Sequence, residues 1–289
     1  MSKRYKIIIV LLIFSLLPIS CKVGPKYTRP KVENSPTSYA NQGTDANVND
    51  SVANVKWFDI FDDPILKDLI QKGLDNNYDL KIALARIEQS KAVLGITKAD
   101  LLPNIGYAGQ INSKQTIAYP TSLGASMSWE LDFWGKIRHE TGALRNELLA
   151  SDEARKVIVS SLVAEIASTY FQLRDFDNRL IITQKTIESR KKSDEIIGQR
   201  FKKGYVSQLD KVQVEQQVAI AERTLQQVIR AITILENSLN ILTGQMPGPI
   251  PRGKWNYEQT VAKQIPVALP STLLENRPDV KRSELDYIA

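Results

Sequence analysis

The most regular pattern of apolar and polar residues in this chain predicts a long helical hairpin over residues 136–244. No proline occurs between Pro120 and Pro247, so nothing in this stretch must break a helix. We expect one helix over about 136–201 and a return helix over about 207–242. The apolar spacing averages about 3.5 residues, which indicates a coiled coil with a left-handed supercoil. The positions are Leu162, Ile166, Thr169, Leu173, Phe176, Leu180, Thr183 and Ile187 on the first helix and Val214, Val218, Ala221, Leu225, Val228, Ile232, Leu235, Leu239 and Leu242 on the second.

The first of these helices is much longer than a globular helix. About 65 residues at a rise of ~1.5 Å per residue span on the order of 100 Å. Such a long helical rod usually connects two separated sites, so the function of this chain depends on what lies at the two ends of the rod.

The turn between the two helices carries its own local signals. Gly204 is expected to take the left-handed conformation that ends a helix. Lys202 and Lys203 suit the negative end of the helix dipole. Ser207 can cap the return helix, with Asp210 as the third helical residue.

Before the hairpin, residues 104–135 alternate between apolar and polar positions and predict two β-strands. We expect the strands at Asn104–Tyr119 and Ser122–Trp134, with the turn at Pro120-Thr121. Such alternation is typical of a membrane β-barrel with one face toward lipid and the other toward water, although a half-buried hairpin of a soluble protein alternates in the same way. A single hairpin has two open edges, so in a bilayer further strands must complete it.

Residues 57–103 are expected to form a first helical segment. Asp63 followed by Pro64 has the pattern of an N-cap with proline at the first helical position. Asp75-Asn76-Asn77 should end that helix, and a second helix should run over about 79–100.

The N-terminus has the pattern of an export signal. Basic residues precede an apolar run of about 11 residues, shorter than the ~20 that a membrane helix needs. We interpret residues 1–20 as a signal peptide. The single cysteine, Cys21, follows as in a bacterial lipobox, and acyl chains on it would anchor the protein in a membrane; an ordinary signal peptide with an incidental cysteine is the alternative. Residues 21–56 are polar and are expected to form a lipidated tether.

Composition narrows the class of protein. The 289 residues are 43% apolar and 24% charged, so a buried core is available. A formal net charge of +6 without a clustered basic face does not indicate nucleic-acid binding. With one cysteine and one histidine, His139, a disulfide and a zinc site of the usual type are not expected. No nucleophile elbow, phosphate loop or paired metal ligands are found, so we expect no enzymatic activity and no cofactor.

After the hairpin, prolines mark residues 245–270 as a linker, and residues 271–289 return to an earlier pattern. The sequence Leu-Glu-Asn-Arg-Pro-Asp-Val-Lys at 274–281 echoes Leu-Asp-Asn-Asn-Tyr-Asp-Leu-Lys at 74–81, 200 residues earlier. A long period of this kind suggests a duplicated unit. We therefore expect one unit and the opening of a second.

Together these motifs resemble the outer-membrane efflux proteins of Gram-negative bacteria, the TolC-like channels, in their lipoprotein (NodT-type) branch. The motifs occur in family order over nearly the whole chain, and their combination is specific although each alone is weak. The matching residues are Cys21–Tyr27 with Pro30, Trp57 with Phe61–Pro64 and Leu66, Ala99–Pro103, Trp129–Gly135, Arg200-Phe201 with Gly204, Ser207 and Asp210, and Asn276–Val280.

The resemblance implies an α+β membrane protein with a long α-helical coiled-coil hairpin in a periplasmic α-barrel. It also implies an antiparallel β-hairpin of an outer-membrane β-barrel, and two structural repeats of which this chain holds the first. Family members are homotrimers in which each protomer gives four strands to one barrel. They pass drugs, metals or other small molecules outward and catalyse nothing. Their hairpin tip meets a periplasmic adaptor that bridges to an inner-membrane pump.

Carried over by position, Cys21 is the lipid site, and Gly204, Tyr205, Val206 and Ser207 form the adaptor-binding tip; no catalytic, cofactor-binding or metal residue is implied. The expected location is the cell outer membrane, lipid-anchored and extending into the periplasm, with outer-membrane lipid, adaptor and pump as partners and no nucleic acid.

The family's second unit is missing here, so we expect a partial sequence or a truncated, non-functional product, and we assign no gating residue. Three copies of this chain would supply only six barrel strands. A further hypothesis is that six copies of this chain assemble in place of three chains that each contain both units. The runner-up function is a periplasmic adaptor lipoprotein, which also has a signal, a lipid anchor and a coiled-coil hairpin. An adaptor, however, would continue into compact β-rich domains.

Overall fold

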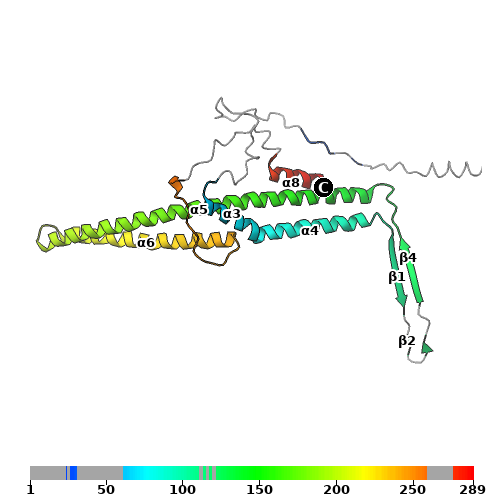
Figure 1. Cartoon of the computed structure of the whole chain (residues 1–289), viewed down its shortest axis with the longest axis horizontal. Helices are drawn as coiled ribbons and strands as arrows, with labels where there is room; N and C mark the ends of the chain where they lie inside the picture. Colours follow the sequence, from blue (N-terminus) through cyan, green and yellow to red (C-terminus); the bar gives the residue numbers. More distant parts are fainter. Residues whose placement is uncertain are drawn as a thin grey trace, which may run out of the picture. The chain divides into compact units, whose positions relative to one another are not determined.

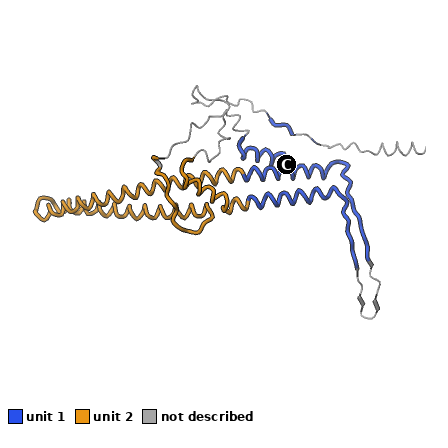
Figure 2. The backbone as a smooth tube through the Cα atoms, viewed as in Figure 1, with its two compact units in different colours: residues 1–36, 83–155, 274–289 blue, residues 37–82, 156–273 orange. Residues whose placement is uncertain are grey.

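The computed structural model describes residue 24 and residues 27–30, 61–110, 113–114, 117–118, 122–258 and 276–289. The expected signal peptide, Cys21 and most of the tether therefore lie outside the described residues. The chain divides into two compact units (Figure 2). Unit 1 comprises residues 1–36, 83–155 and 274–289, and unit 2 comprises residues 37–82 and 156–273.

Unit 2 is built on a helical hairpin made by the C-terminal part of α5 (Lys136–Lys202) and by α6 (Gln208–Leu242). Figure 1 shows the two helices side by side and antiparallel. Their bounds agree with the predicted ones to within one residue, so the predicted hairpin is confirmed. Buried residues of the predicted seam include Leu162, Ile166, Leu173, Val228, Ile232 and Leu239. Val163, Ala167 and Tyr170 of α5 are buried as well, beside the predicted seam.

The helix α3 (Pro64–Asn76) packs against the base of this hairpin. As predicted, Asp63 is its N-cap, and its carboxylate accepts a hydrogen bond from the backbone N–H of Ile65 at 2.9 Å. A Cβ on Gly73 would overlap the Ile166 side chain, so α3 and α5 approach closely at that point. The buried face of α3 consists of Leu66, Leu69, Ile70 and Gly73.

Asn77 ends α3 and starts α4 (Tyr78–Ala99). Its side-chain oxygen accepts from the backbone N–H groups of Asp79 at 2.9 Å and Leu80 at 3.1 Å. Its side-chain amide donates to the carbonyl of Leu242 at 3.0 Å, which ties the junction to the end of α6. The predicted end of the helix at residues 75–77 is confirmed. Through Asn77, this junction also contacts a part of the chain that is distant in sequence.

Unit 1 contains the remainder of α4, the first 20 residues of α5 and two small antiparallel sheets. The first sheet pairs β1 (Asn104–Gln110) with β4 (Ser122–Ser128), and the second pairs β2 (Ser113–Lys114) with β3 (Ile117–Ala118). Ile105 lies opposite Met127 and Tyr107 opposite Ala125, so the apolar positions of both strands share one face. Among the described residues, no helix is both long and apolar enough to cross a bilayer.

Two details of the strand prediction are wrong. Because Lys114 pairs with Ile117, the chain reverses between these residues and not at Pro120-Thr121, and no single strand spans 104–119. The last strand ends at Ser128, where a strand to Trp134 was expected. Its partner strand begins after Pro103, which has no backbone N–H with which to continue the ladder.

Unit 1 also contains α8 (Pro278–Ile288). This helix begins 200 residues after α4 begins, which is the offset of the sequence echo. Glu284 of α8 binds the N-terminal segment: Tyr27 donates to its carboxylate at 2.9 Å, and Arg29 forms an ion pair with it at 2.5 Å. The Tyr27 and Tyr287 rings meet edge to face at 5.9 Å. Residues near the two ends of the sequence are thus held together.

Candidate functional site

The tip of the α5–α6 hairpin begins with a Schellman motif, a regular way to end a helix. The Tyr205 N–H donates to the Arg200 carbonyl at 3.0 Å, and the Gly204 N–H donates to the Phe201 carbonyl at 2.9 Å. Gly204 has φ +76°, the left-handed conformation that this motif requires. Its predicted role as the helix terminator is confirmed.

A reciprocal cap starts α6 on the other side of the turn. The Asp210 N–H donates to the Ser207 hydroxyl at 3.2 Å, and the Ser207 N–H donates to the Asp210 carboxylate at 2.9 Å. Hydrogen bonds from the Ser207 hydroxyl and N–H hold the pKa of Asp210 below its usual value. Both ends of the turn are therefore held by their own hydrogen bonds.

The resulting tip presents apolar and basic side chains to solvent. Tyr205 is 77% exposed and Leu209 is 66% exposed. The Lys211 ammonium lies 5.6 Å from the centre of the Phe201 ring. The four predicted tip residues, 204–207, lie in this one turn, and their role in binding stays a prediction.

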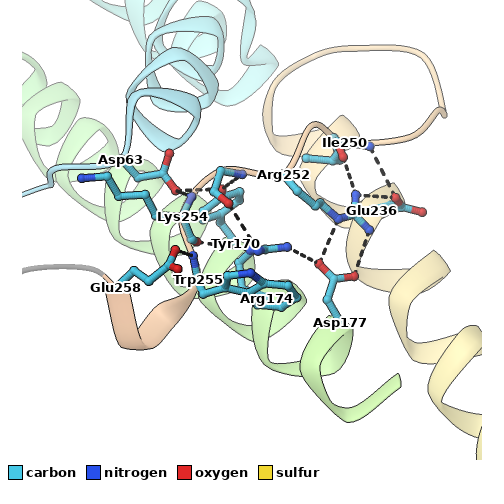
Figure 3. Close-up of polar contacts among 11 residues, drawn as sticks. Asp63, Tyr170, Arg174, Asp177, Glu236, Ile250, Arg252, Lys254, Trp255 and Glu258 are labelled. Carbon is cyan, nitrogen blue, oxygen red and sulfur yellow. Dashed lines mark hydrogen bonds and ion pairs between the residues drawn. The ribbon is translucent and has the colours of Figure 1, made fainter. Parts of the chain in front are cut away.

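The base of the hairpin is crossed by a segment that the sequence indicated only as part of the linker 245–270. We call residues 248–255 the strap (Figure 3). The Asn240 side chain on α6 donates to the Gly248 carbonyl at 2.7 Å. Glu236, also on α6, accepts from the Ile250 N–H at 3.4 Å. The strap is therefore bound along its length and does not simply connect two elements.

Two arginines and two acidic residues join the strap to α5 and α6. Arg252 of the strap donates to Asp177 at 3.0 Å and to Glu236 at 2.7 Å. The buried Arg174 of α5 donates to Asp177 at 2.7 Å and lies 4.0 Å from the centre of the Trp255 ring. Burial disfavours the Arg252 cation, but the bonds to Asp177 and Glu236 outweigh it and raise its pKa. The two positive and two negative charges balance, and their bonds hold the strap against α5 and α6.

Asp63 and Tyr170 fix the far end of the strap and are fully buried. The Tyr170 hydroxyl donates to Asp63 at 2.9 Å and accepts from the Gly253 N–H at 2.8 Å. Asp63 also accepts from the Lys254 N–H at 3.1 Å, and a Cβ on Gly253 would overlap its carboxylate. Burial, together with the bond to Asp63, raises the pKa of Tyr170 to about 12.

Sequence reasoning identified Asp63 only as a helix cap and missed its second role. A glycine between two basic residues, Arg252 and Lys254, was the available signal, but it does not reveal which carboxylate lies against it. Within the described parts of the chain, no three His, Cys, Asp or Glu side chains come together as metal ligands.

The chain matches a family model described as outer membrane efflux protein over residues 69–245. It is 28% identical to Nodulation protein T of Rhizobium leguminosarum bv. trifolii, over 94% of this chain and 60% of that protein. It is 26% identical to cation efflux system protein CusC of Escherichia coli, over 91% of this chain and 59% of that protein. The chain thus spans about 60% of the length of these relatives.

Solved structures agree with this fold. A crystal structure of a membrane protein from Pseudomonas aeruginosa aligns with a TM-score of 0.70 at 26% identity, over 93% of this chain and 62% of that one. The open state of the MtrE outer membrane channel of Neisseria gonorrhoeae aligns with a TM-score of 0.76 at 23% identity, over 93% of this chain and 61% of that one, and supports the fold alone. Because the family match covers more than half of its residues, this chain belongs to the outer membrane efflux protein family.

Proposed function

We propose that the full-length protein is the outer-membrane channel subunit of a tripartite efflux system and passively exports small molecules across the outer membrane. The observation that carries this proposal is the family match over residues 69–245. Relatives are named for cation efflux and for solvent efflux, so the proposal covers small molecules as a class. The protein needs no cofactor for this and catalyses no reaction.

The β1–β4 sheet supports a place in the outer membrane. Its shared apolar face is exposed, and further exposed aromatic residues follow it at 129–134. The Trp129 indole N–H donates to the Leu101 carbonyl at 3.1 Å, so its polar group is satisfied while the ring remains exposed. Aromatic side chains of this kind suit the boundary between lipid and water. In this proposal the apolar face meets lipid, and acyl chains on Cys21 add an anchor. The second unit of the full-length protein and the other copies of a homotrimer supply the further strands.

The hairpin tip supports the docking of a periplasmic adaptor, which in turn contacts an inner-membrane pump. The turn is held by hydrogen bonds at both ends, and Tyr205 and Leu209 are exposed on it. A rigid turn with an exposed aromatic side chain loses little conformational entropy on binding, which favours a protein partner. Gly204, Tyr205, Val206 and Ser207 form the core of this proposed contact.

Export in cells tests the proposal. The full-length protein is expressed in a host that lacks its own outer-membrane channel, and retention of a fluorescent efflux substrate is measured. Wild type should lower retention, and Gly204→Val should not, because a β-branched residue strains the φ of +76° at this turn. Gly198→Ala is the matched control, since Gly198 lies inside α5 with no atom near its Cβ position.

The two failures of this test differ in meaning. Wild type that leaves retention unchanged, although it is inserted in the outer membrane, contradicts the channel function. Gly204→Val that exports as well as wild type contradicts only the docking of a partner at the tip.

A further inference from the structure

Basic side chains outnumber acidic ones at the hairpin tip. Arg200, Lys202 and Lys203 are exposed, and no ion pair joins them to any residue in the described part of the chain. We call these three residues the basic collar. Some other cations of the hairpin are paired within the protein: Lys191 with Glu222 at 2.7 Å, Lys192 with Glu188 at 2.7 Å and Lys211 with Glu215 at 3.3 Å.

The fold does not need three cations at this position. The end of α5 carries the equivalent of about half a negative charge, and one basic side chain is enough to offset it. The single acidic residue between 200 and 210 is Asp210. Its carboxylate already accepts two hydrogen bonds from Ser207. The tip therefore keeps an excess of positive charge that nothing within the described chain balances.

Apolar groups lie in the same turn as this charge. Tyr205 and Leu209 are exposed apolar side chains there, and the basic collar directly precedes them in sequence. An apolar centre with a charged rim is the usual composition of a protein–protein contact. Rim charges mainly set the rate of association and the choice of partner.

We propose that the basic collar selects an acidic partner: the end of a periplasmic adaptor that carries Asp or Glu side chains opposite Arg200, Lys202 and Lys203 and apolar side chains against Tyr205 and Leu209. This inference rests on the proposed docking function. An acidic surface would approach the tip under electrostatic attraction, and a basic surface would be repelled.

Charge reversal in the full-length protein tests the inference in the same export assay. Lys202→Glu with Lys203→Glu should reduce the rate of export roughly tenfold or more, because opposed charges become like charges. Lys202→Gln with Lys203→Gln should give a smaller loss. The matched control is Lys185→Glu with Arg190→Glu, the same change in charge at exposed positions farther along α5, and it should export like wild type.

Suppressor selection then identifies the partner's chemistry. Mutations that restore export to the charge-reversed protein, reversions aside, should replace an acidic residue of a periplasmic protein by a neutral or basic one. Suppressors confined to lipid synthesis would point to an anionic headgroup and would overturn the proposal. So would suppressors that never touch an acidic residue, or normal export by the reversed variant.

The control variants separate the two proposals. If Gly204→Val abolishes export while charge reversal does not, docking at the tip stands and only the acidic partner is wrong. If the charge-reversed protein and its Lys185/Arg190 control lose export equally, a general effect of charge on the helix replaces the proposal.

Discussion

The two ends of the α5–α6 hairpin are stabilised in different ways. At the base, the seam is buried and the strap adds a saturated polar network. In the distal part, between Ile187 and Ala221, no side chain is buried. Asp194 lies seven residues after the seam residue Ile187, where the same spacing of about 3.5 residues places it on the seam. One of its carboxylate oxygens is buried without a hydrogen-bond partner among the described residues. The base is thus stabilised by its own contacts, whereas the side chains of the distal part remain partly or fully exposed.

The largest expected effect concerns the core at the base. Leu239→Ala removes a fully buried side chain and should lower the free energy of unfolding by about 2–5 kcal/mol. Ile196→Ala, in the exposed distal part, should change it by less than about 0.5 kcal/mol. Urea unfolding in detergent, followed by circular dichroism, measures both. Equal losses would show that the distal part is as well packed as the base.

The next effect concerns the polar network under the strap. Tyr170→Phe leaves the Gly253 N–H without its partner and removes a donor from Asp63. The free energy of unfolding should fall by about 1–3 kcal/mol. The amides of Gly253 and Lys254 should also exchange faster with solvent. Tyr205→Phe at the exposed tip is the control and should alter neither quantity; unchanged exchange in Tyr170→Phe would show that the strap is held by its ion pairs alone.

The same hydroxyl predicts a dependence on alkaline pH. The fold raises the pKa of Tyr170 from 10.0 to about 12, so the neutral hydroxyl is favoured in the folded state. The resulting stabilisation is complete below pH 10.0 and is lost as the pH rises toward about 12. The difference in unfolding free energy between wild type and Tyr170→Phe should therefore shrink over this range. A constant difference would contradict the role given to the Tyr170 proton.

The smallest expected effect concerns the distal seam. Asp194→Leu removes a partly buried carboxylate and adds an apolar side chain, so it should stabilise the hairpin by about 1 kcal/mol. Amides over residues 188–200 should exchange more slowly. Glu195→Leu, at an exposed position next to it, is the matched control and should give no gain. A loss of stability in Asp194→Leu would mean that the carboxylate is already satisfied.

Local features of this chain could be predicted from its sequence. The hairpin turn is an example, because the bonds of Gly204 and Ser207 join residues no more than five positions apart. The helix ends could also be predicted, because capping residues and prolines act within one turn of the helix. Strand alternation was also recognised, but the reversal between Lys114 and Ile117 was not, because alternation alone does not specify register.

The sequence by itself therefore determined the helical hairpin, its capped tip and the apolar stripe of the strands, all of which depend on neighbours a few residues away. Only the tertiary structure decided that Asp63 binds Tyr170 and the strap. Tyr170 lies 107 residues after Asp63 in the sequence, and Lys254 of the strap lies 191 residues after it. The same residue types suit a solvated linker and a buried network. Which one forms depends on the packing of α3, α5 and α6, because that packing excludes water and leaves each buried polar group in need of a partner.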